Sequence, residues 1–137
     1  MVDNLTPEAR RRAMAAVKSS DTTPERRVRS ALHRLGYRFR LNDSKLPGRP
    51  DLVLPARKLV IFVHGCYWHG HRCARGARLP RTNAAYWRAK IAGNVARDRQ
   101  RLRQLRRLGW RVLVIWECRT RRADFESWLA RRMPPRA

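Results

Sequence analysis

The sequence has no long apolar run. Its longest apolar stretches, residues 59–63 and 112–116, are five residues each, far below the ~20 residues that a membrane-spanning helix needs. The first residues, MVDNLTPEARRR, contain no apolar core of a secretion signal. We therefore expect a cytosolic (cytoplasmic) protein with no membrane association, whose 137 residues form a single domain with a buried core.

Cysteine is also scarce, with three in the whole chain. An odd number in a reducing compartment argues against a disulfide framework and favours metal binding. Cys66, His71 and Cys73 lie within eight residues, and 44 residues separate Cys73 from Cys118. Three thiolates and one imidazole form a common structural zinc set, although this spacing matches no standard zinc finger. The alternative is three free thiols.

Acidic residues are few: 10 Asp and Glu stand against 33 Lys and Arg, and the formal net charge is +23. Such self-repulsion is tolerated when a polyanion neutralises it, and nucleic acid is the usual partner. Arg outnumbers Lys 29 to 4, which suits bidentate contacts to phosphate and guanine. A GC-rich genome would also favour Arg codons, but it does not explain the excess of basic over acidic residues.

Capping and periodicity predict helices and strands in alternation. Thr23-Pro24-Glu25 is expected to open a helix, with Thr23 as its N-cap and Pro24 in the first turn, and Gly36 is expected to end it. The last strand is nearly continuously apolar and is expected to be buried on both faces, with Trp110 and Trp116 in the core. The other predicted helices span 7–18, 84–108 and 123–132, and the strands span 37–41, 51–54, 58–63 and 111–117. This order predicts an α/β fold, a mixed sheet with helices on its faces.

Two aspartates stand out. Asp51 lies directly before a hydrophobic strand, where a carboxylate could hold Mg²⁺ for phosphodiester cleavage; it could also be an ordinary turn residue after Pro50. Asp98 continues the apolar stripe 87, 91, 95, 98, 102, 105 of the long helix and should face inward. A buried carboxylate needs a partner, such as a histidine or an arginine. The alternative is that Asp98 lies at the edge of the stripe and pairs with a nearby arginine.

The segment HGCYWHGHRC (64–73) holds the remaining candidates. If zinc takes His71, His64 and His69 are left for proton transfer, although a lone histidine is more often structural. Tyr67 and Trp68 are two adjacent bulky aromatics between polar ligands. On a nucleic-acid binder they could wedge between bases; the alternative is that Trp68 belongs to the core.

Three segments together resemble the very short patch repair endonucleases, which are bacterial DNA mismatch endonucleases. They are LPGRPDLVL (46–54), FVHGCYWHGHRC (62–73) and NVARDRQRLRQLRRLGWRVLVIWEC (94–118). The resemblance extends from about residue 8 to 118. It implies a restriction-endonuclease-like fold and a Mg²⁺-dependent nick 5′ of the thymine in T:G mismatches that arise from deaminated 5-methylcytosine. The implied partners are mismatched double-stranded DNA and a MutL-type repair protein, and nicking one strand needs only a monomer.

The resemblance also implies roles for individual residues. Asp51 and the carbonyl of Val63 would hold Mg²⁺. His69 would activate the attacking water with Glu25 as its carboxylate partner, and Asp98 would pair with His64. The implied zinc ligands are Cys66, His71, Cys73 and Cys118. The implied DNA-intercalating residues are Tyr67, Trp68, Trp87 and Met14, the last on a DNA-contacting helix, 7–18.

The chain departs from the family pattern at a few positions. Val63 stands where a threonine is expected, Tyr67 where phenylalanine is usual, and Gly70 within a histidine run. The main-chain carbonyl of residue 63 is the same in valine and threonine, and a tyrosine ring at position 67 can stack as a phenylalanine ring does. The lysine of the wider nuclease superfamily is absent from KLVIFV (58–63), so proton transfer must rest on imidazoles.

Two other functions fit part of the sequence. A zinc-stabilised DNA-binding module without catalysis accounts for the charge, the cysteines and the aromatics. It leaves Asp51, Glu25, Asp98 and two spare histidines unexplained. A basic RNA-binding structural protein accounts for the charge alone.

Overall fold

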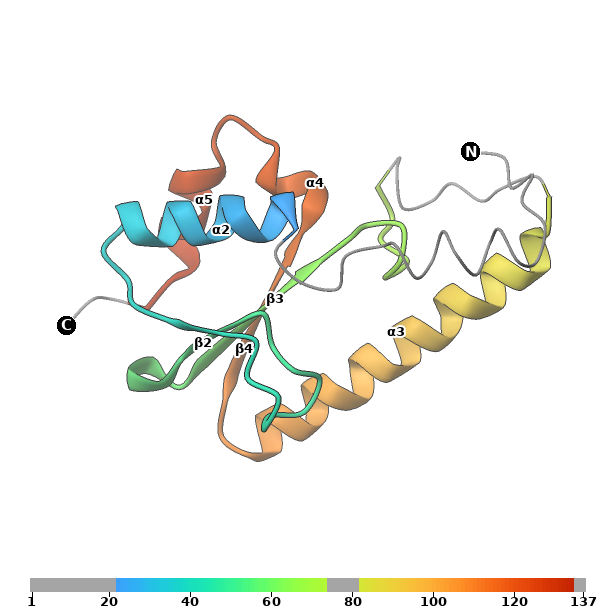
Figure 1. Ribbon diagram of the computed structural model, residues 1–137, viewed down its shortest axis with the longest axis horizontal. Coiled ribbons are helices and arrows are strands. Elements are labelled where there is room, and N and C mark those ends of the chain that lie inside the picture. The colour runs from blue at the N-terminus through green and yellow to red at the C-terminus, as the bar shows by residue number, and fades with distance from the viewer. Residues whose placement is uncertain (1–21, 74–81, 135–137) are drawn as a thin grey trace.

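The structure is a computed structural model that describes residues 22–73 and 82–134. Met14 and the predicted helix 7–18 lie outside the described residues. Figure 1 shows a sheet with α2 and α5 on one side and the long helix α3 on the other. The described elements are α2 (Thr23–Arg34), β1 (Arg40–Leu41), β2 (Leu52–Leu54), η1 (Pro55–Arg57), β3 (Leu59–His64), α3 (Ala84–Arg107), β4 (Arg111–Trp116), α4 (Glu117–Thr120) and α5 (Phe125–Arg132).

The sheet is mixed, with strand order β1-β2-β3-β4. The pairs β1–β2 and β2–β3 are antiparallel, and β3–β4 is parallel. The η1 turn joins β2 to β3 directly, and the two strands form an antiparallel hairpin. Parallel strands need a long crossover, and α3 lies in the chain segment that connects β3 to β4. The predicted α/β class with a mixed sheet is therefore confirmed.

Alternating side chains of the sheet build two separate cores. Ile61 and Ile115 pack in a cluster with Val28 and Leu32 of α2 and with Leu129 of α5. The residues that alternate with them, including Val60 and Phe62, form a second cluster with Leu105 of α3. Because successive side chains of a strand point to opposite faces, His64 continues the row that faces α3.

Helix α2 begins one residue earlier than the capping signal suggested. Thr22 is the N-cap, and its side chain accepts a hydrogen bond from the Glu25 N–H at 3.4 Å. The predicted cap, Thr23, is already helical. The helix ends at Arg34, and Gly36 follows with a φ of +87°. The buried face of α2 includes Glu25, so this carboxyl group is turned into the protein.

Other boundaries also required correction. The predicted strand 37–41 is paired only over β1. The predicted strand 111–117 is β4, but only Ile115 in it is buried and Trp116 is half-buried. β4 ends the sheet order, and no further strand pairs with it in the described part of the chain, so burial on both faces was wrong. Trp110 is likewise half-buried, at the margin of the core on the α3 side.

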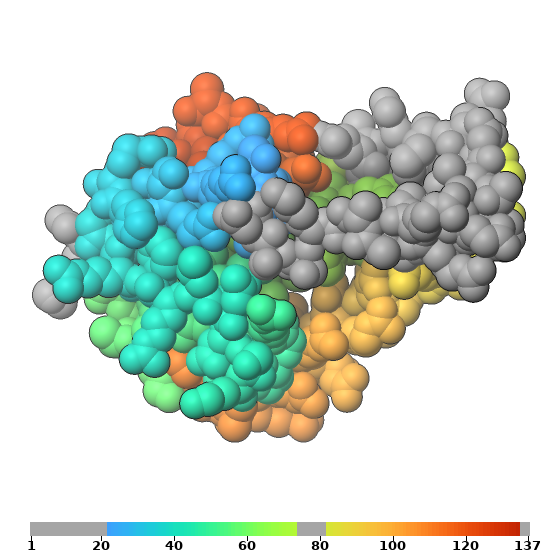
Figure 2. All heavy atoms as spheres, viewed as in Figure 1, coloured from blue at the N-terminus to red at the C-terminus, as the bar shows by residue number. Residues whose placement is uncertain are grey.

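Helix α3 agrees with its predicted extent to within one residue. Trp87 and Leu105 are buried, while Ile91, Val95, Asp98 and Leu102 are half-buried along the same stripe. No helix in the described ranges combines the length and the apolarity needed to cross a bilayer. Figure 2 shows the same view with all atoms as spheres.

Candidate active site and metal centre

The candidate site lies where β3 and β4 end side by side. His64 is the register partner of Trp116. Cys66 and Cys118 each follow two residues after this pair, so the parallel register brings two residues 52 positions apart in the chain into contact. The loop 65–73 then returns His71 and Cys73 to the same place. Local spacing alone could not have shown this, because the contact depends on strand pairing.

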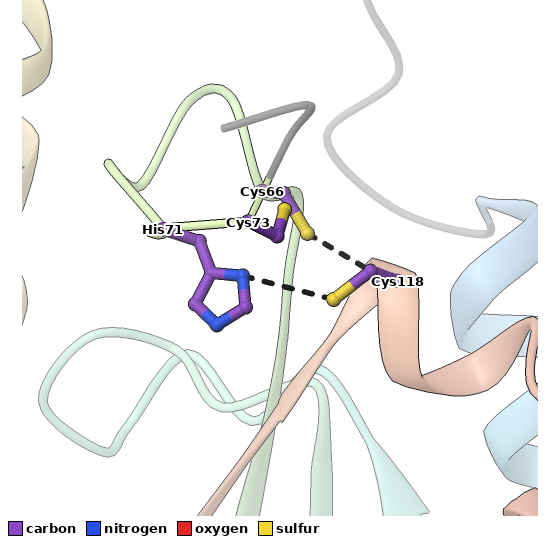
Figure 3. Close-up of side chains that lie close together, drawn as sticks. All are labelled: Cys66, His71, Cys73 and Cys118. Carbon is purple, nitrogen blue, oxygen red and sulfur yellow. Dashed lines mark hydrogen bonds between the residues drawn. The ribbon is translucent and has the colours of Figure 1, made fainter. Parts of the chain in front are cut away.

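The metal-binding cluster consists of Cys66, His71, Cys73 and Cys118 (Figure 3). One ligand atom from each lies within 4.8 Å of the others. The Cys118 N–H donates to Cys66 Sγ at 3.3 Å, and His71 Nδ1 lies 3.7 Å from Cys118 Sγ. Burial raises the pKa of the Cys66 thiol to about 12, so only a bound cation would hold it as a thiolate. This donor set fits a closed tetrahedral zinc site.

Two neighbouring carboxyl groups, the half-buried Asp51 and the buried Glu25, form the second part of the site. Asp51 precedes β2, and its Oδ2 accepts a hydrogen bond from the Val63 N–H at 2.6 Å. Burial, reinforced by the carboxyl group of Glu25 beside it, raises the pKa of Asp51 to about 7. Glu25 is only 5% exposed. Two carboxyl groups placed together away from water repel each other when ionised, and a divalent cation removes that cost.

His69 and Asp98 form the third part. His69 Nδ1 lies 2.6 Å from Asp98 Oδ2. Burial alone would raise the pKa of Asp98, but the hydrogen bond with His69 and the charges of His69, His64 and Arg101 outweigh it and lower that pKa. The resemblance paired Asp98 with His64; the hydrogen bond goes instead to His69, which corrects that assignment. The pairing of His69 with Glu25 stays a prediction.

Helix α3 holds the loop at two successive turns. Asn94 Nδ2 donates to the carbonyl oxygen of Trp68 at 2.7 Å, one turn before Asp98 contacts the next loop residue. Gly70 lies against the same helix face with a φ of +67°. A Cβ there would lie 2.9 Å from Val95 Cγ2. The close approach of loop and helix explains why Asp98 reaches His69: the helix presents it to the middle of the loop, past the strand end.

His64 is buried and lies against His69. The two rings stack with centroids 3.8 Å apart and planes 3° from parallel. Burial and the neighbouring charge of His69 lower the pKa of His64 to about 4, so it is neutral near pH 7. Its buried Nδ1 has no hydrogen-bond partner in the described part of the chain.

His64, His69 and Asp98 meet the distance requirement for holding a metal ion. The ring geometry argues against that role. The lone pairs of an imidazole lie in the plane of its ring, and two parallel planes cannot both contain one ion. At least one ring would have to turn out of the stack. The arrangement therefore suits proton transfer and hydrogen bonding better than metal coordination.

Aromatic side chains pack together beside the histidines. Tyr67 and Trp68 lie with ring centroids 5.0 Å apart, and Trp87 lies 5.8 Å from Trp68. Trp87 is 6% exposed, while the adjacent Tyr86 is 43% exposed. Trp87 would therefore have to move before it could stack on a base.

Tyr86, Asn94 and Trp116 were not identified from the sequence as residues of the site. For Asn94 there was a signal, because it lies one helical turn before Asp98.

Comparisons with known proteins agree with this geometry. A family model described as DNA mismatch endonuclease Vsr matches residues 2–75. The chain is 53% identical over 118 residues to the type II nicking enzyme V.XorIIP of Xanthomonas oryzae pv. oryzae, covering 86% of each chain. It is 44% identical over 121 residues to the DNA mismatch endonuclease Vsr of Escherichia coli, covering 88% of this chain and 77% of that one.

The fold also resembles that of a solved structure. The catalytic domain of the homing endonuclease I-Bth0305I superposes with a TM-score of 0.56 at 24% identity, covering 81% of this chain and 93% of that domain. This likeness supports the restriction-endonuclease-like fold. The relatives confirm an endonuclease that acts on DNA, against the alternative of a non-catalytic DNA-binding module. The chain belongs to the Vsr family of DNA mismatch endonucleases.

Proposed function

We propose that this enzyme nicks one strand of double-stranded DNA 5′ of the thymine in T:G mismatches left by deamination of 5-methylcytosine, in a Mg²⁺-dependent reaction. The observation that carries the proposal is the grouping of Asp51 with the His69–Asp98 pair. Asp51 and His69 are close enough for the charge of one to alter the other's protonation. The Asp51 carboxylate, which could bind a cation, thus lies near the His69 imidazole, which could accept a proton. Both are close to the aromatic residues of the loop 65–73.

His69 is the proposed general base. The ionised Asp98 accepts a hydrogen bond from Nδ1 of His69, which keeps the ring proton on that nitrogen. Nε2 is then the acceptor that takes a proton from the attacking water. Asp98 also stabilises the imidazolium that results. The resemblance implied Glu25 as a partner of His69, and that pairing stays a prediction.

Asp51 is the proposed magnesium ligand, with the carbonyl oxygen of Val63. The Val63 main chain already contacts Asp51 through its N–H, and Glu25 adds a second carboxyl group nearby. Oxygen ligands of this kind suit Mg²⁺. When bound, Mg²⁺ would neutralise charge on the scissile phosphate. The threonine expected at position 63 is not required for this role, because the main chain supplies the oxygen.

His64 is proposed to assist at the phosphate. It is neutral near pH 7 because burial lowers its pKa to about 4. A neutral imidazole can donate one hydrogen bond and accept another. From its position against His69 it would stabilise the pentavalent phosphorus or the leaving oxygen, with no net charge to interfere with the base beside it.

Zinc is the proposed ion of the cysteine cluster, with a structural role. Three thiols and one imidazole leave no open position for a substrate. The ion would link the loop 65–73 to Cys118, just after β4. Since the same loop carries His69, the zinc would hold a catalytic residue in place without touching the reaction.

Selectivity for a mismatch is proposed to come from intercalation. Tyr67 and Trp68, with Trp87 behind them, would enter the stack beside the mispair, and Met14 would act from the opposite groove. A mispaired step costs less to unstack than a paired one, so deformation energy favours it. Tyr67 offers the same ring face as the usual phenylalanine. We further propose that the enzyme acts as a monomer in the bacterial cytoplasm, in cooperation with a MutL-type protein.

A nicking assay tests the activity. A duplex with one T:G pair and strand-specific labels is incubated with protein and Mg²⁺, beside a matched C:G duplex and an Asp51→Ala variant. One cut 5′ of the mispaired thymine is expected from the wild-type protein alone. Equal cutting of the C:G duplex would overturn the mismatch proposal, and equal cutting by the variant would overturn the role of Asp51. Zinc content by atomic absorption, expected near one per chain, tests the metal centre separately.

A further inference from the structure

We propose that Trp116 is a positioning residue that keeps His71 on the metal centre and His64 and His69 in the catalytic pair. The inference rests on the proposed function, since it assumes that the thiol cluster binds a metal and that the two histidines serve nicking. It concerns a residue that sequence reasoning placed in the core. The structure instead places Trp116 in contact with a histidine of each centre.

The ring contacts of Trp116 carry the inference. Its indole stacks face to face on His71, with centroids 4.2 Å apart and an interplanar angle of 15°. The indole also meets His64 edge-on, with centroids 5.2 Å apart and planes at 71°. His69 lies further away, at 6.5 Å. One side chain therefore touches a member of each centre, in two different geometries.

The backbone explains why this residue has that position. Trp116 and His64 are register partners at the ends of parallel strands, so their side chains leave the sheet on the same face. The loop 65–73 then brings His71 back over the indole, where Cys118 also contacts it. The strand pairing thus places the indole beside the end of β3, where His71 of the returning loop stacks on it.

Such a positioning residue is needed because three histidines, His64 at the end of β3 and His69 and His71 in the loop, lie within eight residues. His69 and His71 both lie between Cys66 and Cys73, and chain length alone allows either to reach the thiols. An imidazole recruited by the metal is lost to proton transfer. Stacking on Trp116 would hold His71 at Cys118, and the edge contact with the indole would keep His64 in its place against His69.

Cobalt spectroscopy with matched variants tests the proposal. Co²⁺ replaces zinc in purified wild-type protein and in Trp116→Leu, Trp116→Phe and Trp110→Leu. The visible bands report the number of thiolate and imidazole ligands. Trp110 is a matched control, because it is another half-buried tryptophan, next to β4 at its opposite end. His71→Ala supplies the reference spectrum for a centre without its imidazole.

The expected result separates the two tryptophans. Trp116→Leu should show an altered cobalt spectrum, approaching that of His71→Ala or indicating a mixture of ligand sets. Its kcat for nicking should fall by about 10- to 100-fold, the usual effect of losing a residue that orients a metal ligand, with KM within about threefold. Trp116→Phe should keep most of both properties, because it retains a ring to stack. Trp110→Leu should lose stability but keep the wild-type spectrum and kcat.

Several results would overturn the inference. A wild-type cobalt spectrum and kcat in Trp116→Leu would do so, and so would equal effects of Trp110→Leu. If Trp116→Leu does not fold by circular dichroism, Trp116→Met replaces it with a longer, unbranched and more adaptable ring-less side chain, judged by the same criteria. Failure of the wild-type protein to nick any mismatch would overturn the proposed function alone, since the cobalt spectra still decide whether Trp116 selects the ligand.

Discussion

His69 Nδ1 and Asp98 Oδ2 lie 2.6 Å apart, joining the loop after β3 to the middle of helix α3. The two residues are 29 positions apart in the chain. Through this contact Asp98, which faces inward from an amphipathic helix, orients the imidazole of His69. It also leaves His64 in a different role, stacked and neutral against the base.

Replacing Asp98 by Asn should cost most of the activity. The amide cannot stabilise the imidazolium and permits the other ring tautomer, so we expect kcat to fall by about 10²- to 10⁴-fold with little change in KM. Single-turnover nicking of a T:G duplex measures this. Asp124→Asn is the control, since that side chain is 53% exposed. A rate within threefold of wild type for Asp98→Asn would exclude the pair from catalysis.

The magnesium requirement should depend on pH. Burial and the neighbouring Glu25 raise the pKa of Asp51 to about 7, and a cation binds the ionised carboxylate. Below about pH 7, the Mg²⁺ concentration for half-maximal nicking should therefore rise by up to about tenfold per pH unit, and above about pH 8 it should be constant. Titrations with Mg²⁺ at fixed ionic strength from about pH 5.5 to 8.5 measure this. The same half-maximal concentration at pH 6 and pH 8 would contradict the assignment.

Asp51→Asn should stabilise the protein when no Mg²⁺ is added. A carboxyl group whose pKa rises from 3.8 to about 7 on folding favours the folded state fully below its unfolded pKa, and this contribution is lost as the pH rises through about 7. At pH 8 the Asn variant should gain about 2 kcal/mol in the free energy of unfolding. This is about half of what the whole rise in the pKa of Asp51 would give at 1.36 kcal/mol per pKa unit. At pH 4 the gain should nearly vanish. Urea denaturation of both proteins at both pH values measures this difference. An Asn variant that is less stable than wild type at pH 8 would contradict the prediction.

Gly70→Ala should disturb the catalytic loop. The new Cβ would lie 2.9 Å from Val95 Cγ2 and 3.1 Å from Ile91 Cγ2, at a φ of +67°. We expect a loss of about 1–3 kcal/mol in the free energy of unfolding and at least tenfold lower kcat, since the loop must move away from α3. Gly109→Ala is a matched control: its φ is +90°, but nothing lies within 4 Å. If both variants behave alike, backbone strain and not the contact with α3 is responsible.

Removal of the proposed zinc should destabilise the fold around the loop. Cys118→Ser should lose stoichiometric zinc and melt at least about 5 °C lower, because a structural ion contributes its binding energy to folding. Differential scanning calorimetry with and without a chelator measures this. Zn²⁺ added after chelation should restore the wild-type melting temperature and leave that of the variant unchanged. Identical melting of the two proteins would leave the cysteines without a structural metal.

Local sequence determined much of this protein. Capping and periodicity located α3 to within a residue and turned Asp98 inward, because helical phase depends only on the spacing of neighbours. The residue types of the loop 64–73 and the net charge of +23 indicated metal, imidazole chemistry and a nucleic-acid partner. Boundaries governed by pairing were less accurate: β1 covers only two of the five residues predicted for it.

Only the tertiary structure decided which of these groups meet. The parallel register of β3 and β4 placed Cys66 beside Cys118 and His64 beside Trp116. The packing of α3 on the loop assigned Asp98 to His69. Such contacts join residues tens of positions apart, and their free energy depends on strand pairing and helix packing that no short stretch of sequence contains. The sequence determined the chemistry available to the site, and the fold decided the partner of each group.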